Sequence, residues 1–187
     1  MIVVQFSATI LKVIMKISTH ISVVLLGLFG SVAYAQPVTT GWYMAPTAGV
    51  VINDSSRAKD TGGAVGLVVG KVLNNKWNVE FGGQYLLLDG KHDEQANIGA
   101  DALYFFNRNV DFAPYAIVGL AYAREGYSDT DNNDNLLVRG GVGFTKQLTK
   151  TIDFRTDVRY QWHNNTASAN SLGDWVITVG LNIPLGK

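Results

Sequence analysis

The strongest structural signal in this 187-residue chain is an alternation of side chains with a period of two. It is clearest between residues 152 and 163. One face carries Ile152, Phe154, Thr156, Val158, Tyr160 and Trp162, and the other carries Asp153, Arg155, Asp157, Arg159, Gln161 and His163. Successive side chains of a β-strand point to opposite faces of a sheet, so the pattern predicts a strand with one apolar and one charged face.

The same alternation predicts five further strands, and two more are expected at 41–52 and 61–72, where Gly and Val fall on both sides and leave the facing ambiguous. The eight predicted strands are 41–52, 61–72, 77–87, 97–106, 116–122, 136–145, 152–163 and 174–185. Most have about ten residues, the length with which a tilted strand crosses a bilayer. After residue 35 there is no run of 18 apolar residues, so a transmembrane helix is not expected there.

The predicted connections alternate in length. Short turns are expected at 74–75, 107–109 and 149–150, where Asn and Thr favour tight turns. Longer polar loops are expected at 53–60, 89–94, 125–135 and 164–173. Short turns at one end and long loops at the other are typical of outer-membrane barrels.

The aromatic residues and glycines indicate which face meets lipid. Trp77, Phe105, Phe106 and Phe112 lie near the short turns, and Tyr85, Tyr122, Tyr160, Trp162 and Trp175 lie near the long loops. Two aromatic bands are typical of membrane interfaces, and glycine on the polar face suits a crowded lumen. The predicted fold is therefore all-β, an eight-stranded antiparallel up-and-down transmembrane β-barrel. The alternative is a soluble periplasmic β-barrel or sandwich, with its aromatic face inward.

The N-terminus predicts export. Residues 1–35 have no acidic residue, an apolar stretch near 21–32 and an Ala33-Tyr34-Ala35 cleavage site, so they are interpreted as a cleaved signal peptide. Translation from Met15 rather than Met1 would give a more usual signal length. The barrel domain is then 36–187, with 13 basic and 15 acidic residues. The absence of Cys excludes disulfides, and the lack of a basic run argues against nucleic acid as a partner.

Three segments resemble the OmpA transmembrane barrel. They are Tyr160-Gln161-Trp162 with Asn164-Asn165, Val79-Glu80-Phe81-Gly82-Gly83, and Val179-Gly180-Leu181 with Leu185-Gly186. The resemblance spans 41–186 and implies an eight-stranded barrel in a Gram-negative outer membrane. It does not extend to the family's peptidoglycan-binding domain. Glu80 matches a lumen glutamate of the family, but Asp101 and Asp157 replace its lysine and arginine.

Charged residues on the polar face are expected to form a network in the lumen. They are Glu80, Asp101, Arg139, Asp153, Arg155, Asp157 and Arg159. Buried charges need partners, so four acids and three arginines predict a plug that fills the barrel and fixes its register. A gate or proton path is the alternative interpretation. An open porin, which takes about 16 strands, is not expected.

The predicted function is a structural, envelope-integrity or surface-interaction role without catalysis, cofactor or metal. The expected partners are outer-membrane lipid, lipopolysaccharide and the barrel assembly machinery, and the sequence identifies no extracellular partner. A lipid A-modifying enzyme is a less favoured alternative, with His163, Ser168, Ser171 and Asp174 as candidate groups. A calcium loop beginning at Asp129 is disfavoured, because Asp134 and Gly140 stand where Gly and Glu are required.

Overall fold

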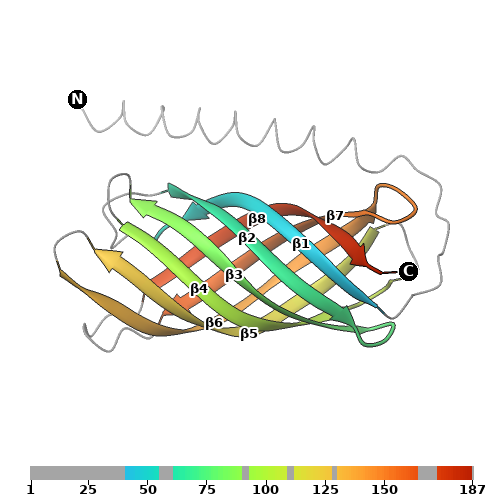
Figure 1. The fold of residues 1–187 in the computed structure, drawn as a ribbon, viewed down its shortest axis with the longest axis horizontal. Coiled ribbons are helices and arrows are strands. Elements are labelled where there is room, and N and C mark those ends of the chain that lie inside the picture. The colour runs from blue at the N-terminus through green and yellow to red at the C-terminus, as the bar shows by residue number, and fades with distance from the viewer. Residues whose placement is uncertain are drawn as a thin grey trace, which may run out of the picture. The chain divides into compact units, whose positions relative to one another are not determined.

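The chain forms a closed barrel of eight antiparallel strands in the computed structural model (Figure 1). The structure describes residues 41–54, 61–89, 93–108, 112–127, 130–163 and 172–186. The strands are β1 (Trp42–Ile52), β2 (Thr61–Val72), β3 (Trp77–Asp89), β4 (Asp93–Phe105), β5 (Phe112–Tyr127), β6 (Thr130–Gln147), β7 (Asp153–His163) and β8 (Leu172–Leu185). The predicted fold class is confirmed. The predicted signal peptide, 1–35, lies outside the described residues.

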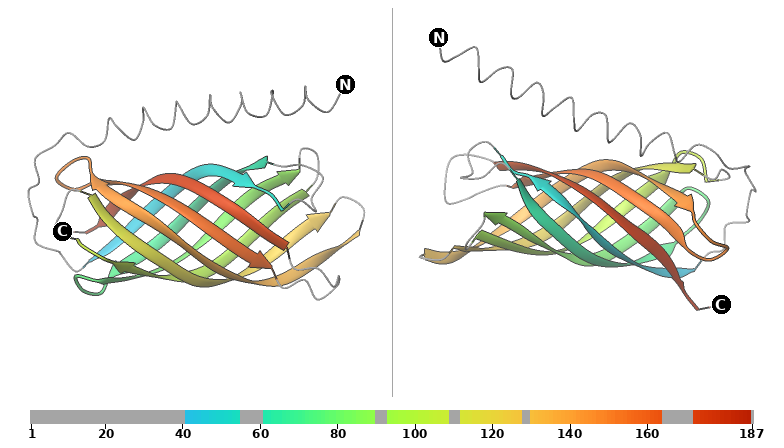
Figure 2. Two further views of the ribbon diagram at one scale, coloured as in Figure 1. Left: turned by 180° about the vertical axis from the view of Figure 1, so that it is seen from behind. Right: turned by 90° about the horizontal axis from the view of Figure 1, so that it is seen from above.

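Each strand pairs with the next along the chain, and β8 returns to pair with β1. Ala48 of β1 stands opposite Val65 of β2 on one side and Val179 of β8 on the other. Figure 2 shows the inclined strands from two further sides. Closure leaves the sheet without an edge, which is the condition under which a β-structure can cross a bilayer. Among the described residues, no helix is long and apolar enough to span a membrane.

Two of the predicted short turns are held by side chains that accept backbone hydrogen bonds. Between β2 and β3, the Asn74 Oδ1 atom accepts from the backbone N–H of Lys76 at 2.8 Å and of Trp77 at 2.9 Å. Between β6 and β7, the Thr149 hydroxyl oxygen accepts from the N–H of Ile152 at 2.9 Å. These are the local bonds by which Asn and Thr favour turns.

One predicted loop is wrong. The segment 125–135 was expected to be a long loop, but β5 continues to Tyr127 and β6 begins at Thr130. Arg124 stands opposite Asp134, and the register shifts between Glu125 and Tyr127. In Figure 1 this hairpin extends beyond the neighbouring strand ends. A strand outside the bilayer has no apolar face to maintain, so its residues lose the alternation from which strands are predicted. For the same reason β3 and β4 reach to Asp89 and Asp93, into the loop predicted at 89–94.

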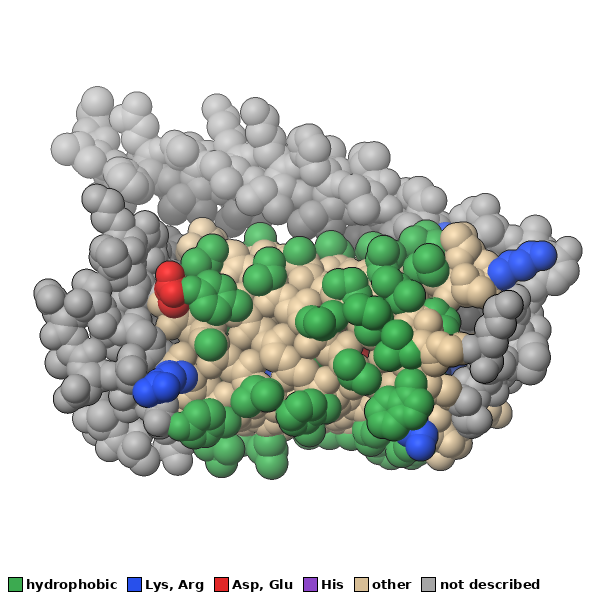
Figure 3. Space-filling model, viewed as in Figure 1, with side chains coloured by type: hydrophobic (Ala, Val, Ile, Leu, Met, Phe, Trp, Pro, Cys, Tyr) green, Lys and Arg blue, Asp and Glu red, His purple; other side chains and the backbone are tan. Residues whose placement is uncertain are grey.

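The barrel wall is apolar on the outside. Val118 is 60% exposed and Leu120 is 55% exposed. The alternate positions of the same strand face the lumen, and Ile117 there is only 4% exposed. On the face in Figure 3, hydrophobic side chains are spread along the wall, and the prominent charged groups lie near its two ends. This arrangement is incompatible with the soluble alternative, in which the aromatic face points inward.

The lumen is more apolar than the sequence suggests. Near the short turns it holds a buried cluster formed by Leu103, Phe105, Ala113, Tyr115 and Ile117. Toward the long loops it holds a second cluster formed by Val51, Ala64, Leu86 and Val176. Apolar side chains therefore lie on both sides of the polar middle of the barrel.

Gly140 and Gly141 provide a matched test of the lumen's close packing. A Cβ on Gly141 would overlap the carbonyl oxygen of Val158, whereas a Cβ on the outward-facing Gly140 would meet nothing closer than 3.8 Å. Gly141→Ala should lower the free energy of unfolding by about 1–3 kcal/mol. Gly140→Ala should change it by about 0.5 kcal/mol or less. Denaturant unfolding in detergent micelles measures both, and equal effects would contradict the packed lumen.

Candidate functional site: the lumen charge cluster

Strand β7 brings three charged side chains into the lumen. Arg155, Asp157 and Arg159 are separated by two residues each, so the period of the strand places all three on the same face. They are 0% to 7% exposed. Three consecutive inward positions of one strand thus supply two positive charges with a negative charge between them.

Two carboxylates approach from neighbouring strands. Glu80 on β3 and Asp101 on β4 are direct cross-strand partners. Like charges in this position repel each other. The repulsion is offset from across the lumen, because Arg155 lies 2.6 Å from Glu80 and Arg159 lies 2.7 Å from Asp101.

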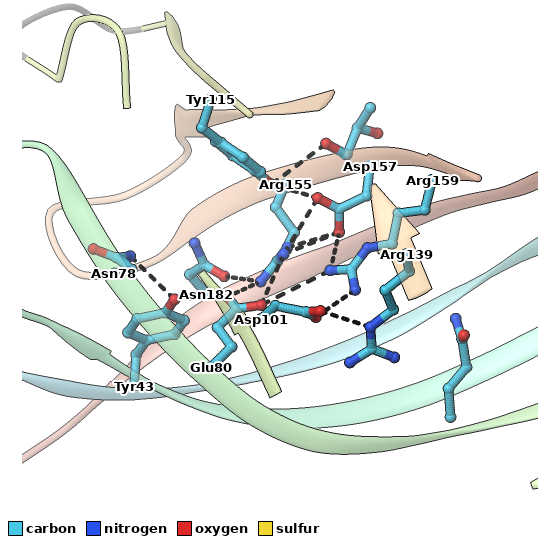
Figure 4. A network of polar contacts seen from close by, with 12 residues as sticks. Tyr43, Asn78, Glu80, Asp101, Tyr115, Arg139, Arg155, Asp157, Arg159 and Asn182 are labelled. Atoms are coloured by element: carbon cyan, nitrogen blue, oxygen red, sulfur yellow. Dashed lines mark hydrogen bonds and ion pairs between the residues drawn. The ribbon is translucent and has the colours of Figure 1, made fainter. Parts of the chain in front are cut away.

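Six residues form one connected set, called here the lumen cluster: Glu80, Asp101, Arg139, Arg155, Asp157 and Arg159 (Figure 4). Arg139 on β6 adds an ion pair of 2.6 Å to Asp101. Asp157 lies 3.0 Å from Arg155 and 3.4 Å from Arg159. Three arginines and three carboxylates make the cluster neutral, which is the condition for retaining so many buried ions.

Two tyrosines extend the lumen cluster, and sequence analysis missed them. The Tyr43 hydroxyl donates to Glu80 Oε1 at 2.6 Å, and the Tyr115 hydroxyl donates to Asp157 Oδ1 at 2.6 Å. Asn78 Nδ2 in turn donates to the Tyr43 hydroxyl oxygen at 3.1 Å. Alternation could have identified Tyr115, because it lies between the outward positions of β5.

Asp153 lies apart from the lumen cluster, contrary to the predicted network. It is half-buried at the short-turn end, and among the described residues no ion pair joins it to the cluster. Its electrostatic partner is Arg108, in the turn between β4 and β5. Burial lowers the pKa of Arg108 to about 10, against the attraction of Tyr43 and Asp153. Arg108 also donates to Asn78 at 2.7 Å. Without Asp153 the predicted excess of acid disappears.

Glycines make room for the charged side chains. A Cβ on Gly119 would overlap the Asp101 carboxylate, and one on Gly143 would lie 2.7 Å from both Asp157 and the Tyr115 ring. A cavity of about 20 Å³ lies beside the cluster. It has space for about one water molecule. The described side chains of the cluster therefore pack closely around it.

The eight residues of the predicted aromatic girdle all point outward. Their exposed fractions lie between 38% and 60%, and they are Trp77, Tyr85, Phe106, Phe112, Tyr122, Tyr160, Trp162 and Trp175. Phe105, which was also expected near this band, faces the lumen at 3% exposed. The guanidinium carbon of Arg108 lies 3.6 Å from the centre of the Phe105 ring. Phe105 precedes Phe106 by one residue, so the two cannot share a face.

The band near the short turns includes further rings. Trp42 is 53% exposed. The Tyr104 ring packs edge-on against two neighbours, with its centre 5.0 Å from that of Trp77 and 5.6 Å from that of Phe106. Phe144 contacts Phe112 at 4.4 Å between ring centres. Near the loops, the Tyr160 and Trp175 rings lie 5.1 Å apart.

The candidate catalytic groups do not come together in the described part of the chain. Asp174 is buried, and its carboxylate accepts from the backbone N–H of Asp54 at 2.8 Å. Asp54 in turn accepts from the N–H of Gly173 at 3.0 Å, which ties the ends of β1 and β8 together. Ser168, Ser171, Asp129 and the side chain of His163 lie outside the described residues. Among the described residues, no three potential ligands are placed to hold a metal ion.

The fold and its apolar outer surface define an eight-stranded transmembrane β-barrel. A family model described as the outer membrane protein beta-barrel domain matches residues 21–183. The chain belongs to this family. No curated protein matches the chain in sequence.

Solved structures with the same architecture are distant in sequence. Neisserial surface protein A has 16% identity and a TM-score of 0.66, over 78% of this chain and 98% of that one. The N-terminal barrel domain of Pseudomonas aeruginosa OprF has 18% identity and a TM-score of 0.54, over 78% and 98%. P. aeruginosa OprG has 18% identity and a TM-score of 0.53, over 82% and 100%. At these identities the likeness shows the fold alone.

Asp101→Asn tests the energy of the lumen cluster. The substitution keeps the shape of the side chain but leaves Arg139 and Arg159 without their closest carboxylate, so it should lower the free energy of unfolding by about 3–5 kcal/mol. Asp153→Asn, the same chemical change outside the cluster, should cost about 1 kcal/mol or less. Unfolding midpoints in the same detergent compare the two. Equal losses of unfolding free energy would show that Asp101 in the lumen cluster contributes no more to stability than Asp153 outside it.

Proposed function

We propose that this chain is an outer-membrane barrel with a structural role in the envelope, whose lumen is closed to the free passage of ions. The observation that carries the proposal is the neutral, buried lumen cluster. Six ionised side chains from β3, β4, β6 and β7 meet within hydrogen-bonding and ion-pair distance across the barrel. Such a cluster joins strands that are not neighbours in the sheet and holds them in one arrangement.

The packing of the lumen supports closure. The cavity beside the cluster, about 20 Å³, has space for about one water molecule, and a hydrated ion carries several. Buried apolar clusters lie on both sides of the charges, and burial beside apolar side chains makes the entry of a hydrated ion costly. A path for bulk ions would require the cluster to come apart.

The location follows from family membership and the N-terminal pattern. We infer that the chain is exported through the signal peptide at 1–35, inserted by the barrel assembly machinery, and resides in a Gram-negative outer membrane. There the long loops face the exterior, among lipopolysaccharide, and the short turns face the periplasm. A surface-interaction role of the loops is the second part of the proposal, without a partner of defined chemistry.

Catalysis is not part of the proposed function. The carboxylate of Asp174 is engaged with the backbone at the β1–β8 junction, which gives it a structural role. The six charged groups of the lumen cluster are engaged with one another.

Planar-bilayer recording tests closure directly. The purified barrel should show only small, rare conductance steps, whereas a general diffusion porin in the same bilayer should show large, stable ones. Folding is checked by heat-modifiable migration on gels. A large, stable conductance from fully folded protein would contradict the proposed closed lumen.

A deletion strain tests the envelope role. Deleting the gene should increase the entry of a large hydrophobic antibiotic, because an outer membrane that lacks this structural protein is a weaker permeability barrier. Wild-type protein and Gly140→Ala should restore the barrier, and Gly141→Ala should restore it only in proportion to the folded amount. An unaltered barrier in the deletion strain would reject this role.

A further inference from the structure

The charges of the barrel are separated along its axis. Near the short turns the described residues contribute five basic groups, Lys71, Lys76, Arg108, Lys146 and Lys150, and a single acid, Asp153. Near the long loops, the residues whose side chains the structure describes contribute three acids, Asp54, Glu94 and Asp174, and a single basic group, Arg124. The lumen cluster between the ends is neutral, so the described side chains make the short-turn end net positive and the long-loop end net negative.

Two of the lysines stand on the lipid-facing side of the wall. Lys71 follows the outward residues Leu67 and Val69 at a spacing of two, and it is itself exposed. Lys146 follows the outward Val142 and Phe144 in the same way. An ammonium group at the end of a membrane strand extends its apolar stem along the wall and places its charge at headgroup depth. These positions therefore face phospholipid headgroups.

Aromatic rings hold the ammonium groups near this depth. Lys71 Nζ lies 5.2 Å from the centre of the exposed Trp42 ring. Lys76 Nζ donates to the Tyr104 hydroxyl oxygen at 3.3 Å and lies 5.7 Å from the ring centre. Trp and Tyr prefer the boundary between hydrocarbon and headgroups. Lys71 and Lys76 thus stand beside rings of the kind that mark the boundary between hydrocarbon and headgroups.

We propose that Lys71, Lys76, Lys146 and Lys150, called here the basic rim, bind the phosphates of anionic phospholipids in the periplasmic leaflet. Trp42 and Tyr104 contact the same lipids beside the headgroup. The inference rests on the membrane orientation given under the proposed function. Each lysine near an anionic surface raises the affinity about fivefold, so the four together give at least a tenfold preference over zwitterionic lipid.

The opposite end of the barrel, called here the acidic rim, carries Asp54, Glu94 and Asp174 among its described side chains, with Arg124 as their single basic neighbour. The described part of that end therefore offers no group of lysines to bind an anionic phospholipid headgroup. The preference for anionic phospholipid is expected at the short-turn end. Bound anionic lipid at the short-turn end would also fix the depth of the barrel in the bilayer.

Tryptophan fluorescence can read each rim separately. The chain has four tryptophans, of which Trp42 and Trp77 lie near the short turns and Trp162 and Trp175 near the loops. The mature protein with both loop-end tryptophans changed to Phe reports the basic rim, and the converse variant reports the acidic rim. Each is folded into phosphatidylcholine vesicles containing increasing fractions of phosphatidylglycerol with brominated chains, which quench nearby indoles. Brominated phosphatidylcholine is the reference.

For the basic-rim reporter, brominated phosphatidylglycerol should reach a given degree of quenching at a membrane fraction at least tenfold lower than brominated phosphatidylcholine does. The acidic-rim reporter should show no such preference. Changing the four lysines to Gln should abolish the preference, while Arg124→Gln leaves it intact. An excess of soluble glycerol phosphate should not compete. Equal quenching by the two lipids, a preference that survives the four substitutions, or full competition by glycerol phosphate would each overturn the proposal.

Insertion is scored in the same samples by heat-modifiable migration. A barrel that inserts into pure phosphatidylcholine but shows no lipid preference refutes the basic rim alone. A chain that fails to insert into any vesicle refutes the membrane barrel on which the proposed function depends. The two failures are therefore distinguishable.

Discussion

Every feature of this barrel depends on the need of a backbone in hydrocarbon to satisfy its own hydrogen bonds. The pairing of β1 with β8 meets that need, because closure removes the two edges of the sheet. Once the sheet is closed, the period of two leaves each side chain either in lipid or in the lumen. An eight-stranded barrel is just wide enough for side chains to fill it. The mixture of charged, apolar and glycine positions inside follows from that narrow space, as Gly119 beside Asp101 shows.

Burying three carboxylates and three guanidinium groups is costly, and an apolar core of the same volume would often be as stable. The arrangement of the charges favours one pairing register of the strands. If β7 slipped by one residue against its neighbours, Arg155, Asp157 and Arg159 would turn outward into hydrocarbon. A slip of β3 would do the same to Glu80. The apolar clusters on either side reinforce this selectivity, because they keep water from the ions and make each unpaired charge more expensive. The lumen cluster thus favours one strand pairing over many near-equivalent ones.

The sequence was sufficient for the features that lie within the bilayer. The alternation of residues 152–163 predicted β7 and the inward direction of its charges, because hydrocarbon enforces a strict division of faces. It failed at the β5–β6 hairpin, where polar residues occur at successive positions of the sequence and the alternation is lost. The partners of each ion could not be predicted either. Whether Asp153 meets Arg108 or Arg155 depends on the stagger of the strands, which a single sequence does not reveal. Phe105 was assigned by its position along the chain rather than by its face.

A neutral lumen has a consequence for the whole molecule. Because the six buried charges cancel, the field outside the barrel depends on the charged residues at its two ends, and the described side chains there differ in net sign. The protein would experience the two leaflets differently even if its apolar wall were symmetric. Reversing the barrel would move the lysines of the short-turn end away from the periplasmic phospholipids that we propose they bind. Closure therefore lets the sheet cross the membrane, the lumen cluster favours one register, and the proposed basic rim provides a contact for anionic lipid at one end only.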